Sequence, residues 1–499
     1  LQNTMAKSGT ANFYNGVATQ SVRFEGDNSA GLLSRTGMSV SNRRTWTWSC
    51  WVKRINLDAN TQGIFGMIDL STVNRQCYIA FDSDHKIYIM NYSQNAGAAV
   101  YNYVTTQVFR DLSAWYHIVW VSDTTNGTAG DRIRLYVNGV RITSFTIATN
   151  PSQNYEGWIN GDGGSGVQLG VGRVVPYAPS DEYLASYMSD ANFVDGLALA
   201  PTNFGETKNG AWIPIEPDVS DYGTNGFRLQ FKETGTGTAS TSTIGADTSG
   251  ISPPNHYTSS GIVASDCAMP DSPENNFATL NPLYVTNSNT TLAEGNLKQT
   301  SATSWLLATS TMGFSSGKWY AELKMIDVVS FSFGIVAASG DSVTNGNTAN
   351  SGYVGRWADG YGWWGNGASA QTINNNSTVN YGVNPSANDI FMLAIDMDNG
   401  DVYMGKEGTW FNSGNPANGT NPAFNNQAQL QDGSTWLIAG GFENANGIWN
   451  FGQNSVFDNE TAGGNADGNG NGDFAYAPPD GFLALCTANL PEPTIGANS

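Results

Sequence analysis

The sequence predicts an all-β protein built from two antiparallel β-sandwiches that are joined by a loop-rich connector. Three observations predict this fold class. Apolar and polar residues alternate with a period of two through most of the chain, as in half-buried antiparallel strands. Asn-Gly pairs separate such runs, and clusters of Gly, Asn, Ser and Thr punctuate the chain between them. No amphipathic helix of three turns is evident.

The clearest hairpin lies at residues 132–142. Ile133, Leu135 and Val137 share one face of its first strand because side chains alternate along a strand. Asn138-Gly139 follows, and this pair suits a type I′ turn, in which both central residues need a positive φ.

A second hairpin is expected where residues 389–396 run through DNGD at 398–401 into residues 402–404. Other alternating or apolar runs predict further strands. These lie at 115–121, 167–171, 317–325, 331–337 and 436–442.

The composition of the chain argues against some classes of function. The chain has 499 residues, of which 13% are charged, and its 22 Lys+Arg against 42 Asp+Glu give a net charge of −20. This balance disfavours a nucleic-acid partner, which would need clustered cations, and Arg43-Arg44 is the densest basic spot. The sequence contains no apolar run of about 18 residues, so it predicts no membrane span. Residues 1–16 lack the pattern of a signal peptide. Aromatic residues make up 12%, enough for sizeable cores.

Strand signals and loop composition divide the chain into zones. We expect an N-terminal segment (1–20), a first sandwich (21–208), a connector (209–291), a second sandwich (292–490) and a C-terminal tail (491–499). The connector is assigned from its Gly/Thr/Ser stretch and its Pro253-Pro254 break.

The four cysteines, Cys50, Cys77, Cys267 and Cys486, form no CxxC pair and predict no metal site. We interpret them as buried free thiols. A Cys50–Cys77 disulfide remains open.

Catalytic motifs are weak. Gly313–Gly317 matches Gly-x-Ser-x-Gly, but a strand rather than a helix follows it, so we interpret it as a turn before a strand. His117 lies inside an apolar strand pattern, where a structural histidine is favoured over a catalytic one. We therefore expect no enzyme and no catalytic residues.

Residues 467–473 match the first half of a calcium loop, but Pro478 stands where the bidentate Glu belongs. We favour a solvated loop and expect no cofactor, with Ca²⁺ as the open alternative.

Four aromatic residues are the candidate ligand-binding residues: Trp357, Tyr361, Trp363 and Trp364, which lie among glycines. Exposed rings stack on the apolar faces of sugars or anchor protein partners, whereas inward rings fill a core. Trp363 and Trp364 are adjacent, so on a strand one points inward and the other outward. The sequence leaves open which is which.

The first zone resembles a concanavalin A-like, laminin G-like jelly roll over about residues 21–208. The resemblance rests on WTWSCWVK at 46–53, AWYHIVWV at 114–121, the hairpin already described, and YMSDANFVDG at 187–196. It implies a possible calcium site at a rim, for which Asp69, Asp82 and Asp84 are candidates. Related glucanases carry Glu-x-Asp-x-x-Glu on one strand, and this chain lacks that string.

The second zone resembles a SPRY (B30.2-like) sandwich. The motifs are SGKWYAE at 316–322, LAIDMDNG at 393–400 and PPDGF at 478–482. The connector, with DSPENNFATLNP at 271–282, resembles a junction in virion proteins of marine bacteriophages.

Together these resemblances imply a non-enzymatic protein on the surface of a phage particle, as a tail fibre or a head-displayed protein. Its partners would be host surface glycan or neighbouring virion proteins, and a homo-oligomer is expected. Alternatives are a purely architectural head-decoration or fibre component, a polysaccharide-degrading enzyme, and a secreted lectin.

Overall fold

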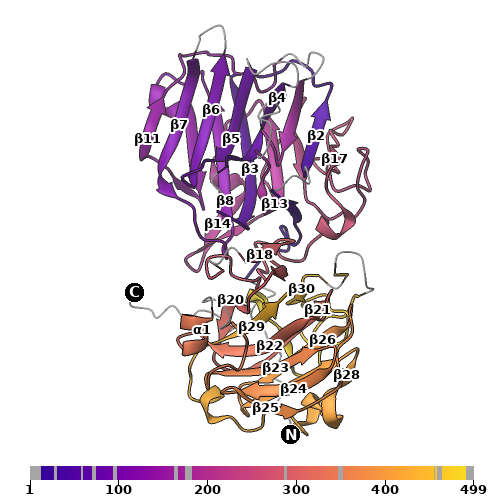
Figure 1. Cartoon of the computed structure of the whole chain (residues 1–499). Coiled ribbons are helices and arrows are strands. Elements are labelled where there is room, and N and C mark those ends of the chain that lie inside the picture. Colours follow the sequence, from indigo (N-terminus) through magenta and orange to yellow (C-terminus); the bar gives the residue numbers. More distant parts are fainter. Residues whose placement is uncertain are drawn as a thin grey trace. The chain divides into compact units, whose positions relative to one another are not determined.

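The computed structural model describes residues 13–26, 31–57, 60–69, 75–93, 98–161, 167–174, 182–285, 289–346, 352–454, 456–457 and 463–490. The predicted tail, 491–499, and most of the predicted N-terminal segment lie outside the described residues. The chain divides into two compact units, residues 1–274 and 275–499, which are described separately. The regular secondary structure of both units is almost entirely antiparallel strand, as predicted (Figure 1).

Unit 1 is a sandwich of two sheets. The first, here the β3 sheet, has the order β1-β13-β3-β8-β9-β10, with β16 also paired to β13. Its strands are β1 (Val22–Glu25), β3 (Thr45–Arg54), β8 (Tyr116–Asp123), β9 (Ile133–Val137), β10 (Val140–Arg141), β13 (Ala185–Asp195) and β16 (Phe227–Leu229).

The second sheet of unit 1, here the β6 sheet, has the order β11-β7-β6-β5-β4-β12-β2-β17 (Figure 1). Its strands are β2 (Leu32–Thr36), β4 (Gln62–Asp69), β5 (Arg75–Phe81), β6 (Lys86–Ser93), β7 (Ala98–Val108), β11 (Phe145–Thr149), β12 (Val167–Val171) and β17 (Thr258–Ser260). A separate ribbon pairs β14 (Gly205–Lys208) with β15 (Ala211–Pro214).

Unit 2 is a second sandwich. Its β21 sheet has the order β18-β19-β30-β21-β26-β27-β28, and β31 pairs with β21 in parallel. The strands are β18 (Thr290–Ala293), β19 (Lys298–Ser301), β21 (Lys318–Met325), β26 (Ile390–Asp396), β27 (Asp401–Lys406), β28 (Thr409–Trp410), β30 (Ala445–Asn450) and β31 (Leu483–Ala484).

The facing β22 sheet has the order β20-β29-β22-β23-β24-β25. Its strands are β20 (Leu306–Phe314), β22 (Ser330–Ala337), β23 (Gly360–Asn366), β24 (Ser369–Asn374), β25 (Ser377–Asn380) and β29 (Trp436–Glu443).

Helix is confined to short segments in the described residues. They are α1 (Asp341–Asn345) and the 3-10 turns η3 (Ala129–Asp131), η4 (Pro201–Asn203), η5 (Ala264–Asp266), η6 (Phe411–Ser413), η7 (Pro416–Asn418), η8 (Ala428–Leu430) and η9 (Thr487–Asn489). None of these described helices has the length or apolar character needed to cross a membrane.

Both predicted hairpins are confirmed. Asn138 and Gly139 have φ values of 48° and 78°, as a type I′ turn between β9 and β10 requires. In unit 2, β26 and β27 pair from Phe391↔Lys406 to Asp396↔Asp401, so the loop predicted from the sequence joins them. The other expected strands match β8, β12, β21, β22 and β29.

Aromatic rings fill the space between the sheets of each unit. In unit 1, Trp48 of β3 stacks on Phe65 of β4, with ring centroids 4.1 Å apart. In unit 2, Phe331 and Phe333 of β22 lie 5.2 and 5.4 Å from the ring of Phe391 on β26. Such contacts between facing sheets join each pair of sheets into one core.

The four cysteines are buried and free, in line with the thiol interpretation, and the Cys50–Cys77 disulfide that had remained open is not formed. Burial raises the pKa of the Cys77 thiol to about 12, so it is neutral at physiological pH.

Residues 209–274, which the sequence assigned to the connector, are built into unit 1. Phe227 and Leu229 of β16 and Tyr257 are completely buried in the core of the jelly roll. β16 is only three residues long, and a period of two is not recognisable in so short a run.

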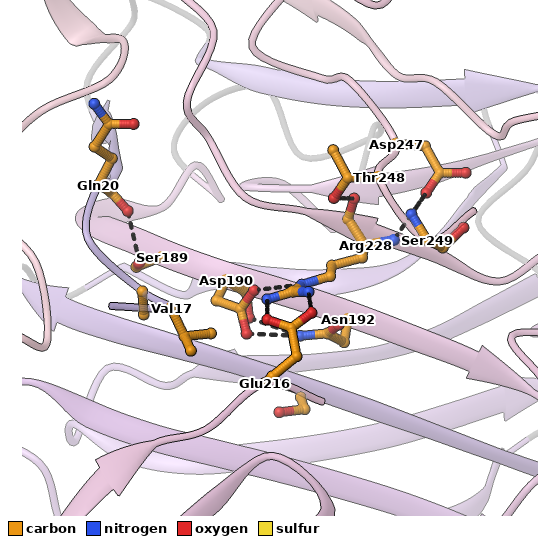
Figure 2. A network of polar contacts seen from close by, with 12 residues as sticks. Val17, Gln20, Ser189, Asp190, Asn192, Glu216, Arg228, Asp247, Thr248 and Ser249 are labelled. Carbon is orange, nitrogen blue, oxygen red and sulfur yellow. Dashed lines mark hydrogen bonds and ion pairs between the residues drawn. The ribbon is translucent and has the colours of Figure 1, made fainter. Parts of the chain in front are cut away.

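A buried ionic network fastens this segment to β13, and Figure 2 shows it from close by. The Arg228 guanidinium donates from Nε to the Asp190 carboxylate at 2.9 Å and from its terminal nitrogens to Glu216. Asp190 lies at the β-bulge of β13, between Ser189 and Asn192, with a φ of 41°. Burial raises the pKa of Asp190, and the guanidinium of Arg228 opposes that rise.

We expect Arg228→Met to destabilise unit 1 by about 3–5 kcal/mol, because it leaves the Asp190 carboxylate buried without its cation. Glu216→Gln is the matched control. The Glu216 side chain is 70% exposed, so its loss should cost about 1 kcal/mol or less. Urea unfolding of the full chain measures both, and equal losses would contradict the assignment of the ionic contribution to Asp190.

Candidate ligand-binding face

Trp363 lies in the core of unit 2. Its side chain is completely buried, with its ring 5.2 Å from that of Phe391, and its indole Nε1 donates to the backbone oxygen of Tyr381 at 2.9 Å. Of the adjacent pair, Trp363 is therefore the inward residue.

Tyr361 is also a core residue, at 4% exposure. Its ring lies 5.6 Å from that of Trp436 and 5.1 Å from that of Phe424. It is two residues before Trp363 on β23, so alternation points both side chains to the same face. The structure thus corrects the candidate set, in which Tyr361 and Trp363 were proposed to bind a ligand.

Trp364 points to the other face of the β22 sheet and is partly exposed. Its register partners are Ser332 on β22 and Gln371 on β24. Within the described part of the chain, the Trp364 side chain makes no ring contact and its indole Nε1 has no hydrogen-bond partner. It therefore has both an apolar ring face and a donor available to a ligand.

Four polar residues share this outer face with Trp364, by alternation and register. Together they form the Trp364 face: Trp364, Asn366, Ser369, Gln371 and Asn380. All five are partly or fully exposed and none is charged. The Gln371 amide donates to the Asn380 side-chain oxygen at 3.0 Å, which fixes the orientation of both amides.

On the side towards β22, residues 352–354 lie over the sheet and border this face. Ser332 is buried, its hydroxyl accepts the amide proton of Val354 at 2.9 Å, and its register partner on β29 is Gly441. The Trp364 face is therefore bordered by residues 352–354 on its β22 side, and it extends over β23, β24 and β25. An uncharged surface with one indole and several amides suits the alternating CH and OH groups of a sugar ring.

Trp357 lies apart from this face, in the loop that precedes β23. Its backbone oxygen accepts from Gly360 and from Asn375, each at 3.3 Å, and Asn375 is in the β24–β25 turn. The Arg356 guanidinium lies 5.2 Å from the indole centroid. Trp357 is partly exposed, but the structure does not bring it together with Trp364.

His117 is the histidine with the most enclosed environment. Its imidazole is completely buried, Trp212 Nε1 donates to Nδ1 at 2.9 Å, and Nε2 lies 2.9 Å from the Ser49 hydroxyl. Because Nδ1 is an acceptor, the neutral ring carries its proton on Nε2 and donates it to Ser49. It therefore cannot accept a proton from Ser49, and this Ser–His pair has a structural role.

Glu322 is a buried carboxylate that sequence reasoning missed. Its oxygens accept from the Tyr320 hydroxyl, the Asn450 amide and the backbone N–H groups of Ala475 and Tyr476, at 2.8–3.1 Å. Burial raises its pKa to about 7 despite these donors. All four donors belong to the protein, so the role of this carboxylate is to hold residues 475–476 against β21. The SGKWYAE motif contains Glu322 but does not indicate this role, because the Asn450, Ala475 and Tyr476 donors are at least 128 residues away in the chain.

The remaining motif residues serve as turns. The Gly-x-Ser-x-Gly match ends β20 and forms the turn before β21. In the suggested calcium loop, the Asp467 carboxylate already accepts from the backbone of Asn469, Asn471 and Ala484 and from the Asn489 amide.

The three rim candidates do not form a ligand set. Asp82 Oδ1 accepts from the backbone of Asp84 and Lys86 in the β5–β6 turn, and the Asp84 carboxylate pairs with the Lys86 ammonium at 3.2 Å. Among the residues that the structure describes, Asp69, Asp82 and Asp84 do not gather into a group that could hold a metal ion.

The adjacent tryptophans make a matched mutational pair. Trp363→Ala should destabilise unit 2 by about 3–5 kcal/mol, because it opens a cavity in the core. Trp364→Ala should cost about 1 kcal/mol or less, because the ring is partly in water. Urea denaturation measures both variants, and a large loss with Trp364→Ala would contradict the outward placement.

His117 should make unit 1 sensitive to acid. Burial lowers the pKa of His117 to about 3, against about 6.5 in the unfolded chain. The neutral, buried imidazole therefore contributes to the free energy of unfolding, and this contribution is complete above pH 6.5. As the pH falls from 6.5 towards 3, the contribution decreases by about 1.4 kcal/mol per pH unit. His117→Gln should reduce the pH dependence of urea unfolding over this range. His256→Gln is the control, and equal slopes in both variants would contradict the prediction.

One family of known proteins matches part of unit 1. Residues 25–170 match a family described as the concanavalin A-like lectin/glucanases superfamily (Laminin_G_3). This match supports the laminin G-like resemblance for that part of the chain. No curated protein shows significant sequence similarity to the chain.

Solved structures with detectable similarity include two SPRY domains and a pentraxin. The PSpry domain of TRIM65 is 12% identical, over 35% of this chain and 92% of that one, with a TM-score of 0.25. The SPRY domain of human HERC1 is 12% identical, over 34% and 96%, with a TM-score of 0.25. The heptameric SAP-like pentraxin from Limulus polyphemus is 18% identical, over 37% and 80%, with a TM-score of 0.26.

Proposed function

We propose that this chain is a non-enzymatic recognition protein on the surface of a bacteriophage particle, and that its Trp364 face binds host surface glycan. The concanavalin A-like family match over residues 25–170 suggests carbohydrate or protein recognition at the level of the fold. The placement on a phage particle rests on the resemblance of the motifs, above all the junction at 271–282.

The observation that carries the glycan assignment is the unpartnered Trp364 indole on an uncharged face of amides and a hydroxyl. A ring that is partly exposed and touches no other ring keeps an apolar surface available to a sugar. Gln371 and Asn380, already oriented by their mutual hydrogen bond, offer further donors and acceptors without losing much side-chain entropy on binding.

A non-enzymatic role is supported by the way the enclosed titratable groups are used. His117 donates to Ser49, and Glu322 is satisfied by four donors from the protein. A glycosidase needs two carboxylates about 5–10 Å apart across an open site. The Trp364 face contains no carboxylate.

An architectural role is the second candidate, and one observation favours it. The edge strand β25 is exposed along its whole length, and Val379 on it is 65% exposed. An uncharged exposed edge can pair with a strand of a neighbouring subunit.

Binding of the purified full chain to an array of bacterial surface polysaccharides tests the glycan assignment. We expect binding to a neutral polysaccharide, weakened about tenfold or more by Trp364→Ala, since an aromatic anchor contributes about 2 kcal/mol. Trp357→Ala is the matched control and should bind as the unchanged chain does. Unchanged binding by Trp364→Ala would remove this face from the assignment.

Gold-antibody labelling of purified particles tests the virion assignment separately. Label on tail fibres would agree with host recognition, whereas label spread over the head would favour the architectural role. An absence of label on any particle would contradict both.

A further inference from the structure

Two guanidinium groups lie against one indole in unit 1. The Arg75 guanidinium is 5.2 Å from the ring centroid of Trp158, and that of Arg43 is 5.7 Å away. The ring itself is held firmly, because its Nε1 donates to the backbone oxygen of Tyr92 at 2.7 Å. The backbone N–H of Trp158 also donates to the Asn91 side chain at 3.2 Å. The indole is therefore a fixed support for both cations.

Among the described residues, positive charge exceeds negative charge at this place, although the chain carries a net charge of −20. Arg43, Arg44 and Arg75 contribute three cations. Glu156 is the carboxylate that pairs with Arg44 at 2.9 Å and with Arg43 at 3.5 Å. Among the residues the structure describes, Arg75 has no carboxylate and no hydrogen-bond acceptor, and its contact is the Trp158 ring.

The two arginines differ in how much of their donor capacity is used. Arg43 donates from Nε to the backbone oxygen of Gly157 at 2.8 Å and is anchored there. Arg75, which begins β5, is partly exposed, and in the described part of the chain no acceptor pairs with its guanidinium N–H groups. A guanidinium held against an aromatic ring is pre-organised, and its planar fork matches a carboxylate or sulfate group.

We propose that Arg75, supported by Trp158 and Arg43, binds the anionic groups of an acidic polysaccharide. A nucleic acid presents one charge per about 1.7 Å and needs a larger set of cations than three arginines. A polysaccharide with one carboxylate or sulfate per repeat needs only a local site, and its neutral parts are not repelled by the acidic chain. The inference goes beyond the Trp364 face, since the Arg75 site lies in unit 1 and would bind a charged group rather than a neutral sugar.

Affinity electrophoresis of the full chain tests the proposal, with polygalacturonate, dextran sulfate or neutral dextran in the gel at low salt. We expect retardation by one or both anionic polymers and none by dextran. Arg75→Gln should weaken binding about tenfold or more, because it removes a charge-assisted hydrogen-bonding fork. Arg75→Lys should weaken it to a smaller extent, since the charge stays and the fork is lost.

Arg141→Gln is the matched control, because it removes the same charge from an exposed arginine that is paired with Asp131. It should bind as the unchanged chain does, and so should Trp364→Ala, which separates this proposal from the function of unit 2. Equal binding by Arg75→Gln and the unchanged chain would overturn the proposal, as would a lack of retardation by both anionic polymers. Equally tight binding of poly-glutamate would identify an acidic protein segment and overturn the polysaccharide assignment. Thermal unfolding confirms that each variant is folded.

Discussion

The alternation of side chains across a two-layered sandwich is the constraint on which the rest of the structure depends. Each strand must point one set of side chains into the space between the sheets, and in unit 2 aromatic rings such as Phe331 and Phe391 fill that space. Trp363 completes this packing, so its neighbour Trp364 has to point outward. The candidate glycan-binding ring is thus exposed as a direct consequence of how the core is filled.

Buried polar groups hold the irregular segments in a single arrangement, which apolar packing alone does not specify. Arg228 connects β16 to the bulge of β13 through Asp190. Glu322 holds residues 475–476 against β21 through two backbone N–H groups. In each unit a buried carboxyl group on a long strand accepts hydrogen bonds from a segment with few ladder hydrogen bonds of its own, and these contacts hold that segment against the strand.

Features set by neighbouring residues could be predicted from the sequence. The Asn138-Gly139 turn needs only its own backbone angles, and β12 follows from its own five residues. The orientation of the Trp363-Trp364 pair could not, because it depends on which face of β23 meets the opposite sheet. The place of residues 209–274 could not either, because contacts such as that between Asp190 and Arg228, 38 residues apart, have no local signature.

The two proposed surfaces would recognise different chemistry, and this difference matters for how tightly the chain could hold a polysaccharide. The Trp364 face is uncharged and would bind the apolar face and hydroxyls of a sugar, whereas Arg75 would bind an isolated anionic group. Each contact alone is small, so single-site affinity would be modest. A polymer that repeats both features would engage several sites on many displayed copies, and the resulting avidity would exceed either affinity without any further contact. Discrimination would then depend on the repeat as a whole, because a neutral polymer lacks the group that Arg75 binds.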